Sequence, residues 1–200
     1  KAQFIIDSEV LDRFPSLEVL ASPSTGENHI DRSACAARGI KVLSLLDDRK
    51  GLETISASAE FTFKLLLDAL RKPPALELQG KWVGVIGYGR IGRRLEKWCH
   101  AFGARVSISD PPEGWNMTLT DMFHWCDAVV IACTLTPETQ GMITGELLRS
   151  MKPGAALVNT ARGEIIDEDA LAEVMRERPD LRVAVDVLVG ETTGTHNPER

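Results

Sequence analysis

The 200-residue chain predicts an α/β fold built on a doubly wound parallel sheet. Short apolar runs alternate with helical segments from Lys81 onward, which is the pattern of repeated β-α-β units. The runs are almost continuously apolar, as expected of strands buried on both faces. A glycine-rich turn directly follows the first run. The predicted strands cover residues 81–86, 105–109, 128–132, 155–158 and 182–185.

The turn after the first strand has the spacing G-x-G-x-x-G at Gly87, Gly89 and Gly92. The first glycine allows the tight turn, the second lets a diphosphate approach the backbone, and the third lets the next helix pack on the strand. A helix over about residues 90–102 would direct its N-terminal N–H groups at that diphosphate. The motif predicts a Rossmann dinucleotide site that includes Tyr88, Arg90 and Ile91.

Asp110 ends the second predicted strand, 18 residues after Gly92. That spacing is close to the one expected of a carboxylate that binds the ribose hydroxyls of a dinucleotide. The glycine motif alone does not exclude the alternative, which is a structural βαβ unit that binds no ligand.

The remaining strand ends also carry small or polar residues. In an open parallel sheet, ligands bind beyond the carboxyl ends of the strands. Arg162 follows a buried strand and precedes Gly163, so its guanidinium is suited to hold a carboxylate by two parallel hydrogen bonds. Its alternative role is that of a surface cation on a loop. The other residues at these ends are Cys133, Thr134, Thr160, Ala161 and Asp186.

Residues 1–72 predict a smaller domain, and residues 73–200 predict the dinucleotide domain. Pro73-Pro74 ends a long helix over about 58–72 and marks the boundary. The helix has Phe61, Leu65, Leu66 and Ala69 at helical spacing, which predicts its buried face. Upstream, Asp31 is suited to cap a helix that Gly39 ends. Strands are expected at 17–20 and 41–44.

Composition restricts the partners and the compartment. The net charge of −6 argues against binding to nucleic acid or to an anionic membrane surface. No apolar run approaches the length of a membrane span, and no signal peptide opens the chain. The four cysteines form no C-x-x-C pair, so no metal site is predicted and a reducing cytoplasm is expected. Because the chain begins at Lys1 without an initiator Met, residues are expected to be missing upstream.

Several segments, in order, resemble the NAD-dependent D-isomer-specific 2-hydroxyacid dehydrogenases, which include phosphoglycerate, glycerate and D-lactate dehydrogenases. The resemblance covers about residues 17–191, and its most specific part is 151–163, Met-Lys-Pro-Gly-Ala-Ala-Leu-Val-Asn-Thr-Ala-Arg-Gly. The other matching segments are 85–92, 135–143, 166–171, 184–187, 22–31 and 58–61.

This resemblance implies a Rossmann NAD-binding domain and a smaller, incomplete flavodoxin-like substrate domain. It implies an oxidoreductase that moves a hydride between NAD(H) and C2 of a small D-2-hydroxy or 2-oxo acid, and that forms a homodimer. Arg162 would bind the substrate and polarise its carbonyl, and the backbone of Thr25 and Gly26 would hold the substrate carboxylate. Glu191 would pair with a catalytic His, and Thr139 would join the cofactor-binding residues.

The chain also departs from the family pattern. It is shorter, the first strand and helix of the substrate domain are absent, and no downstream Thr-Pro-His segment carries the catalytic His. His196 lies only five residues after Glu191, which is too close. A truncated or incompletely ordered copy is therefore expected. Two alternatives remain: an NAD-sensing regulator similar to the C-terminal-binding-protein corepressors, and an inactive fragment that only dimerises. The sequence does not name the acid.

Overall fold

The computed structural model describes residues 5–27, 29–110, 114–115 and 117–190. Its residues form two compact units, one within Lys1–Ile55 and one within Ser56–Val189. Each unit is described by itself.

The first unit has a parallel two-stranded sheet, β1 (Val19–Ser22) and β2 (Lys41–Ser44), in which Val19 pairs with Lys41. Asp31 caps α2 by accepting a hydrogen bond from the N–H of Ala34 at 2.8 Å. The predicted strand at 17–20 was misplaced by two residues, because the N–H of Leu17 donates to Phe14 in a turn. The helices of this unit are α1 (Ser8–Asp12), α2 (Arg32–Ala37), the 3-10 helix η1 (Leu45–Asp47) and α3 (Arg49–Thr54).

The second unit contains a six-stranded sheet with the order β5-β4-β3-β6-β7-β8. All neighbours are parallel except the short edge strand β5. From β3 the chain first adds β4 on one side and later β6 on the other, so the strand order reverses between β3 and β6. The strands are β3 (Trp82–Ile86), β4 (Arg105–Asp110), β5 (Gly114–Trp115), β6 (Ala128–Ile131), β7 (Ala156–Asn159) and β8 (Arg182–Val185). The predicted doubly wound sheet is confirmed, with each of the five predicted strands correct to within one residue.

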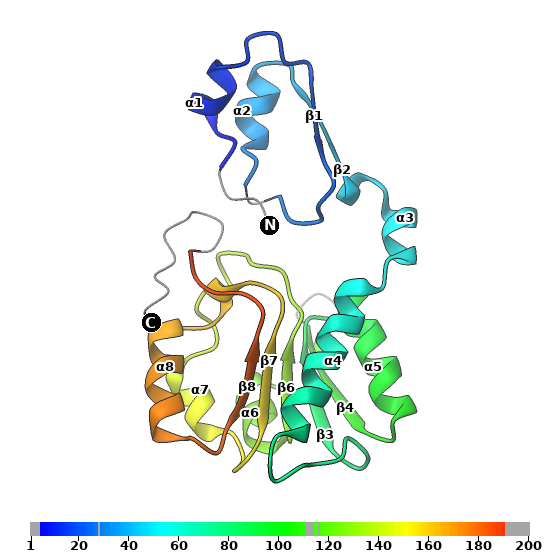
Figure 1. Ribbon diagram of the computed structural model, residues 1–200, viewed down its shortest axis with the longest axis vertical. Helices are drawn as coiled ribbons and strands as arrows, with labels where there is room; N and C mark the ends of the chain where they lie inside the picture. The colour runs from blue at the N-terminus through cyan, green and yellow to red at the C-terminus, as the bar shows by residue number, and fades with distance from the viewer. Residues whose placement is uncertain (1–4, 28, 111–113, 116, 191–200) are drawn as a thin grey trace. The chain divides into compact units, whose positions relative to one another are not determined.

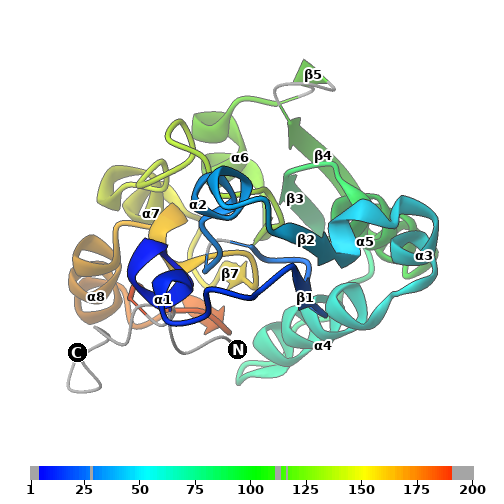
Figure 2. The same ribbon diagram turned by 90° about the horizontal axis from the view of Figure 1, so that it is seen from above.

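Helices cover both faces of this sheet (Figures 1 and 2). On one face, Leu66 and Leu95 pack with Val83 and Val130 of the strands. On the other face, Phe123 and Leu148 pack with strand residues such as Val129 and Leu157. The first face carries α4 (Ala57–Arg71) and α5 (Arg90–Ala101); the second carries α6 (Leu119–Trp125), α7 (Gly145–Ser150), the 3-10 helix η2 (Gly163–Ile165) and α8 (Glu168–Glu177).

Helix α4 belongs to the second unit, so the compact units divide at Ser56 and not at the predicted prolyl boundary. The helix packs on β7 and β8. Its predicted buried face is partly wrong: Phe61 is exposed, whereas Thr62 is fully buried beside Leu66 and Ala69. The sheet thus selects a helix face that includes one hydroxyl and excludes one aromatic ring.

In the parts of the chain that the structure describes, no helix is long and apolar enough to cross a membrane. The cysteines Cys35, Cys99 and Cys126 are buried and Cys133 is half-buried, and all four carry free thiols.

Candidate active site

The glycine loop joins β3 to α5, and two of its three glycines are required by the protein's own backbone. Gly87 has φ +96°, and a Cβ there would lie 2.5 Å from the backbone N of Cys133. A Cβ on Gly92 would lie 2.1 Å from the carbonyl O of Gly87. Both distances are far below van der Waals contact, so side chains at these two positions would displace the loop from the sheet.

Gly89 differs from the other two glycines. It is the N-cap of the 12-residue helix α5, and a Cβ placed on it would meet no atom within 4 Å. The open space therefore lies beside the helix N-terminus, where N–H groups and the helix dipole favour an anion. Arg90 and Ile91 form the first turn and are half-buried. The open space beside Gly89 and the helix N-terminus fits a dinucleotide diphosphate. A Cβ at Gly89 would fill the space that the diphosphate needs.

Asp110, at the end of β4, is tied directly to the glycine loop. Its Oδ2 accepts a hydrogen bond from the backbone N–H of Tyr88 at 2.8 Å. The Tyr88 hydroxyl donates to Glu96, and the guanidinium of Arg93 lies 6.0 Å from the centre of the Tyr88 ring. These contacts hold the Tyr88 side chain along α5 and keep the Asp110 carboxylate beside the loop.

After β6, the chain passes Cys133 and enters a loop that is shaped by Thr139. The Thr139 hydroxyl donates to the carbonyl of Thr134 at 2.8 Å and accepts from the N–H of Thr136 at 2.8 Å. Thr139 therefore stabilises the loop that presents Thr134, and its hydroxyl proton is already used. Burial raises the pKa of the Cys133 thiol to about 11, so this side chain is neutral at ordinary pH.

The end of β7 carries Arg162 on a loop that is fixed from within. Asn159 is fully buried; its Oδ1 accepts from the N–H of Ala161 at 3.0 Å, and its Nδ2 donates to the carbonyl of Arg162 at 2.8 Å. Arg162 is half-buried, and its Nη1 donates to the carbonyl of Ala161 at 2.7 Å. The Thr160 hydroxyl lies 2.6 Å from that of Thr62 on α4.

Two of these residues, Asn159 and Thr62, were missed by the sequence reasoning as parts of the site. The available signal was a polar residue at a position where the apolar pattern requires a buried one. In a buried segment, such a residue costs free energy unless it is hydrogen-bonded, so its presence indicates a specific partner.

Most predicted site residues lie at the carboxyl ends of the strands in the second unit's sheet. The glycine loop, Asp110, the Cys133–Thr134 segment and the Thr160–Arg162 loop follow four strands that are parallel to one another. Asp186 follows β8 and is exposed, and its N–H donates to the carbonyl of Asn159 at 3.0 Å. These strand ends include those of β3 and β6, between which the strand order reverses. Ligands of open α/β sheets usually bind at this position.

The predicted carboxylate-binding backbone at Thr25 and Gly26 lies in the first unit, after β1. The Ser24 hydroxyl donates to the carbonyl of Gly26 at 2.7 Å and closes a tight turn. Glu191 and His196 lie outside the described residues. Within the described part of the chain, no group of three or more His, Cys, Asp or Glu side chains is placed to hold a metal ion.

Comparisons with known proteins identify the family of the chain. Over 224 residues the chain is 34% identical to a glyoxylate reductase from Thermofilum pendens, covering 96% of this chain and 65% of that protein. It is also 34% identical over 196 residues to D-3-phosphoglycerate dehydrogenase from Mycobacterium bovis, covering 85% of this chain and 36% of the relative. The chain thus spans between about a third and two thirds of the length of these curated relatives.

Among solved structures, the TT0316 protein from Thermus thermophilus superposes with a TM-score of 0.82 at 33% identity. The match covers 98% of this chain and 68% of that one. Because the curated relatives are named for catalytic activities, the alternative of an NAD-sensing regulator gains no support from them. Residues 53–199 match the NAD binding domain of the D-isomer specific 2-hydroxyacid dehydrogenases, so the cofactor is NAD. The chain belongs to the D-isomer specific 2-hydroxyacid dehydrogenase family.

Proposed function

We propose that the protein is an oxidoreductase that moves a hydride between NAD(H) and C2 of a small D-2-hydroxy or 2-oxo acid. The observation that carries the proposal is the placement of Arg162 on a hydrogen-bonded loop at the same sheet edge as the glycine loop and Asp110. A planar guanidinium at this edge is suited to grip a substrate carboxylate and to polarise the adjacent carbonyl.

The protein's own groups would bind and orient the acid, while NAD supplies or accepts the hydride. We assign the grip on the substrate carboxylate to Arg162. On the family resemblance alone, we also assign carboxylate binding to the backbone N–H groups of Thr25 and Gly26. Proton transfer is assigned to a His that is not among the four of this sequence, with Glu191 as the carboxylate that keeps that His protonated. The first unit would then be the substrate domain, and the second unit would be the NAD domain.

The test of this function is Arg162→Lys in the full-length protein, assayed with a panel of 2-oxo acids by NADH absorbance. Lysine keeps the charge but loses the planar fork, so kcat/KM should fall about a hundredfold or more. NADH affinity and the melting temperature should stay near wild type. Arg176→Lys on the exposed end of α8 is the matched control and should change none of these values. Near-normal turnover in Arg162→Lys would contradict the assigned grip.

We also propose that NAD is preferred over NADP, because the Asp110 carboxylate is fixed beside the glycine loop and would repel a 2′-phosphate. Asp110→Ala should weaken NADH binding and relax the preference, as measured by calorimetry with both cofactors. Tighter binding of NADPH than of NADH by the wild-type protein would overturn this proposal.

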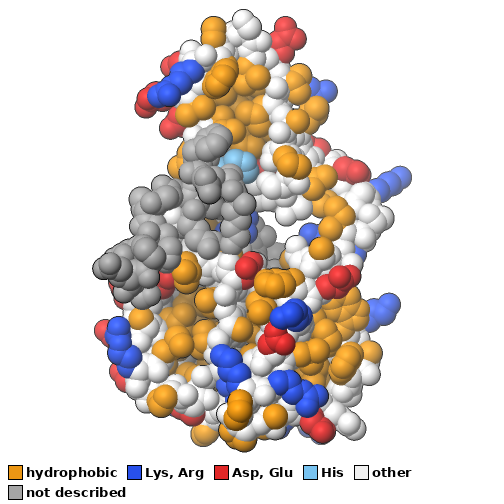
Figure 3. Space-filling view, in the orientation of Figure 1, with side chains coloured by type: hydrophobic (Ala, Val, Ile, Leu, Met, Phe, Trp, Pro, Cys, Tyr) orange, Lys and Arg blue, Asp and Glu red, His pale blue; other side chains and the backbone are white. Residues whose placement is uncertain are grey.

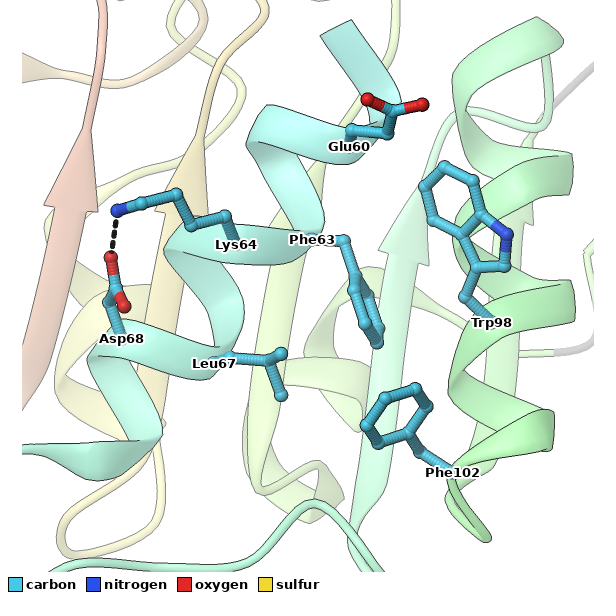
Figure 4. Close-up of a pocket in the computed structure, with 7 residues that line it drawn as sticks. All are labelled: Glu60, Phe63, Lys64, Leu67, Asp68, Trp98 and Phe102. Atoms are coloured by element: carbon cyan, nitrogen blue, oxygen red, sulfur yellow. Dashed lines mark hydrogen bonds and ion pairs between the residues drawn. The ribbon is translucent and has the colours of Figure 1, made fainter. Parts of the chain in front are cut away.

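A homodimer through the second unit completes the proposal. A groove of about 400 Å³ lies between α4 and α5, and the floor contains Phe63, Leu67, Trp98 and Phe102. Figure 4 shows these side chains turned toward one another, and Figure 3 shows hydrophobic side chains exposed over this part of the unit. Glu60, Lys64 and Asp68 border the groove along α4.

The charges of that border support a second copy as the occupant. The charges alternate in sign along α4, with Lys64 between Glu60 and Asp68. Two antiparallel copies of α4 that cross between residues 60 and 64 place Lys64 of each copy beside Glu60 of the other, which is the reciprocal pairing of a two-fold interface. The four free thiols fit a reducing compartment, so the cytoplasm is the proposed location.

A further inference from the structure

Thr62 is the polar residue on the buried face of α4. Its side chain is fully buried, although the face around it consists of Ala59, Leu66 and Ala69. The hydroxyl lies 2.7 Å from the carbonyl O of Ser58 and 2.6 Å from the hydroxyl of Thr160, which follows β7. Two residues that are 98 positions apart in sequence thus share a short hydrogen bond next to the Arg162 loop.

The direction of this hydrogen bond follows from counting protons. A hydroxyl has one proton and two lone pairs, and a carbonyl oxygen has none to give. The Thr62 proton must therefore go to Ser58, and Thr160 must be the donor to Thr62. With its proton committed, the Thr160 oxygen can only accept hydrogen bonds from a ligand. Thr62 thereby decides which type of group Thr160 can recognise.

We propose that Thr62 is a positioning residue of the active site, an inference that rests on the proposed function. It acts through Thr160: it fixes the rotamer of that side chain and orients its free lone pair toward an N–H or O–H donor of the bound ligands. Asn159 holds the backbone of the same loop, so the loop is restrained from the strand and from the helix.

Helix α4 is a rigid support for this contact. Near its C-terminal end, the buried guanidinium of Arg182 donates to the carbonyls of Leu70 and Lys72 at 2.8 Å each. The helix is therefore attached to β8 at one end and to the β7 loop near the other. Thr62 cannot follow a displaced Thr160 without breaking these attachments, which makes the position of Thr160 well defined.

The test compares Thr62→Val, which keeps the shape and removes the hydroxyl, with Thr62→Ser, which keeps the hydroxyl. Thr54→Val is the control, because the Thr54 hydroxyl also donates to a carbonyl one turn back in a helix, that of Gly51 at 2.7 Å. The measurements on the full-length protein are the NADH dissociation constant by calorimetry without substrate, kcat and KM for a 2-oxo acid, and the melting temperature.

Thr62→Val should weaken NADH binding about tenfold, which corresponds to about 1.4 kcal/mol. Thr62→Ser should restore binding to within about twofold of wild type, and Thr54→Val should have no effect. The double variant Thr62→Val/Thr160→Val should bind no more weakly than Thr160→Val alone, because both changes remove the same interaction. Since Thr160 is half-buried, its variant keeps the test informative even if Thr62→Val folds poorly.

The outcomes separate this inference from the proposed function. Wild-type NADH affinity and kinetics in Thr62→Val, with only a lower melting temperature, would show a structural role and overturn the inference. Additive losses in the double variant would also overturn it. If no 2-oxo acid is reduced but Thr62→Val still weakens NADH binding, the proposed activity fails and the positioning role stands.

Discussion

Two serines on β4 differ in their hydrogen bonding. Ser107 accepts a hydrogen bond from the Trp82 indole N–H at 2.8 Å, whereas the buried Ser109 hydroxyl has no partner among the described residues. Ser109→Ala should therefore raise the free energy of unfolding by up to about 1 kcal/mol, since it removes an unpaired buried polar group. Ser107→Ala should lower it by about 1 kcal/mol by leaving the indole unpaired. Urea denaturation measures the free energy of unfolding of both variants. A lower value for Ser109→Ala than for the wild type would contradict the inference that the Ser109 hydroxyl is unpaired.

The glycine loop gives a second residue-scale prediction. Gly89→Val should abolish NADH binding and leave the melting temperature nearly unchanged, because the valine would occupy open space beside the helix N-terminus. Gly92→Val should lower the melting temperature strongly, because its Cβ would lie 2.1 Å from the Gly87 carbonyl. Calorimetry with NADH and a thermal melt of each variant distinguish the two roles. Unchanged NADH affinity in Gly89→Val would mean that the loop is only structural.

Cys133 allows a prediction about pH. Burial disfavours the thiolate and raises the pKa of Cys133 to about 11, and the thiolate is the reactive form. The rate of alkylation by iodoacetamide should therefore be low at pH 7 and should keep rising about tenfold per pH unit up to pH 10. The alkylation rate of an ordinary exposed thiol levels off above its pKa of about 8.5. Mass spectrometry of the Cys133 peptide measures the rate, and a plateau below pH 9 would contradict the prediction.

At the scale of one element, α4 depends on Arg182 of β8. This guanidinium is 5% exposed and donates to the carbonyls of Leu70, Lys72 and Pro74. Leu70 lies in the last turn of the helix, and the other two residues follow that turn. Arg182→Met should lower the free energy of unfolding by about 3 kcal/mol, because it removes several hydrogen bonds that a buried guanidinium donates to the end of the helix. Arg105→Met is the control, since Arg105 is exposed at the start of β4, and it should change stability by less than about 0.5 kcal/mol. Equal effects of the two changes would contradict the capping role.

At the scale of the whole molecule, the groove between α4 and α5 predicts the oligomeric state. Light scattering of the full-length protein should give twice the mass of one chain at micromolar concentration. Phe102→Glu should give the monomer mass and retain NADH affinity, because a carboxylate in the apolar interface is costly to bury. Trp125→Glu is the control: Trp125 is 50% exposed, against 52% for Phe102, and it does not line the groove. A monomeric wild-type protein would refute the dimer.

The core of the second unit was predictable from the sequence because its determinants are local. Strands buried on both faces appear as apolar runs, and the turn after β3 needs glycine at Gly87 for its φ of +96° and at Gly92 for close packing. The position of Asp110 follows from the length of one βα unit. The α2 helix was predictable for the same reason, because Asp31 caps it by accepting a hydrogen bond from the nearby N–H of Ala34.

By itself, the sequence determined the parallel strands, the glycine loop and the positions of Asp110 and Arg162 at strand ends. Only the tertiary structure decided that α4 packs with the second unit, that Thr62 is buried in place of Phe61, and that Arg182 caps a helix more than a hundred residues away. The physical reason is the range of the interactions. Periodicity and turn chemistry are imposed by neighbours along the chain, whereas the hydrogen bond between Thr62 and Thr160 forms across 98 residues, so no local pattern identifies the partner of the buried Thr62 hydroxyl.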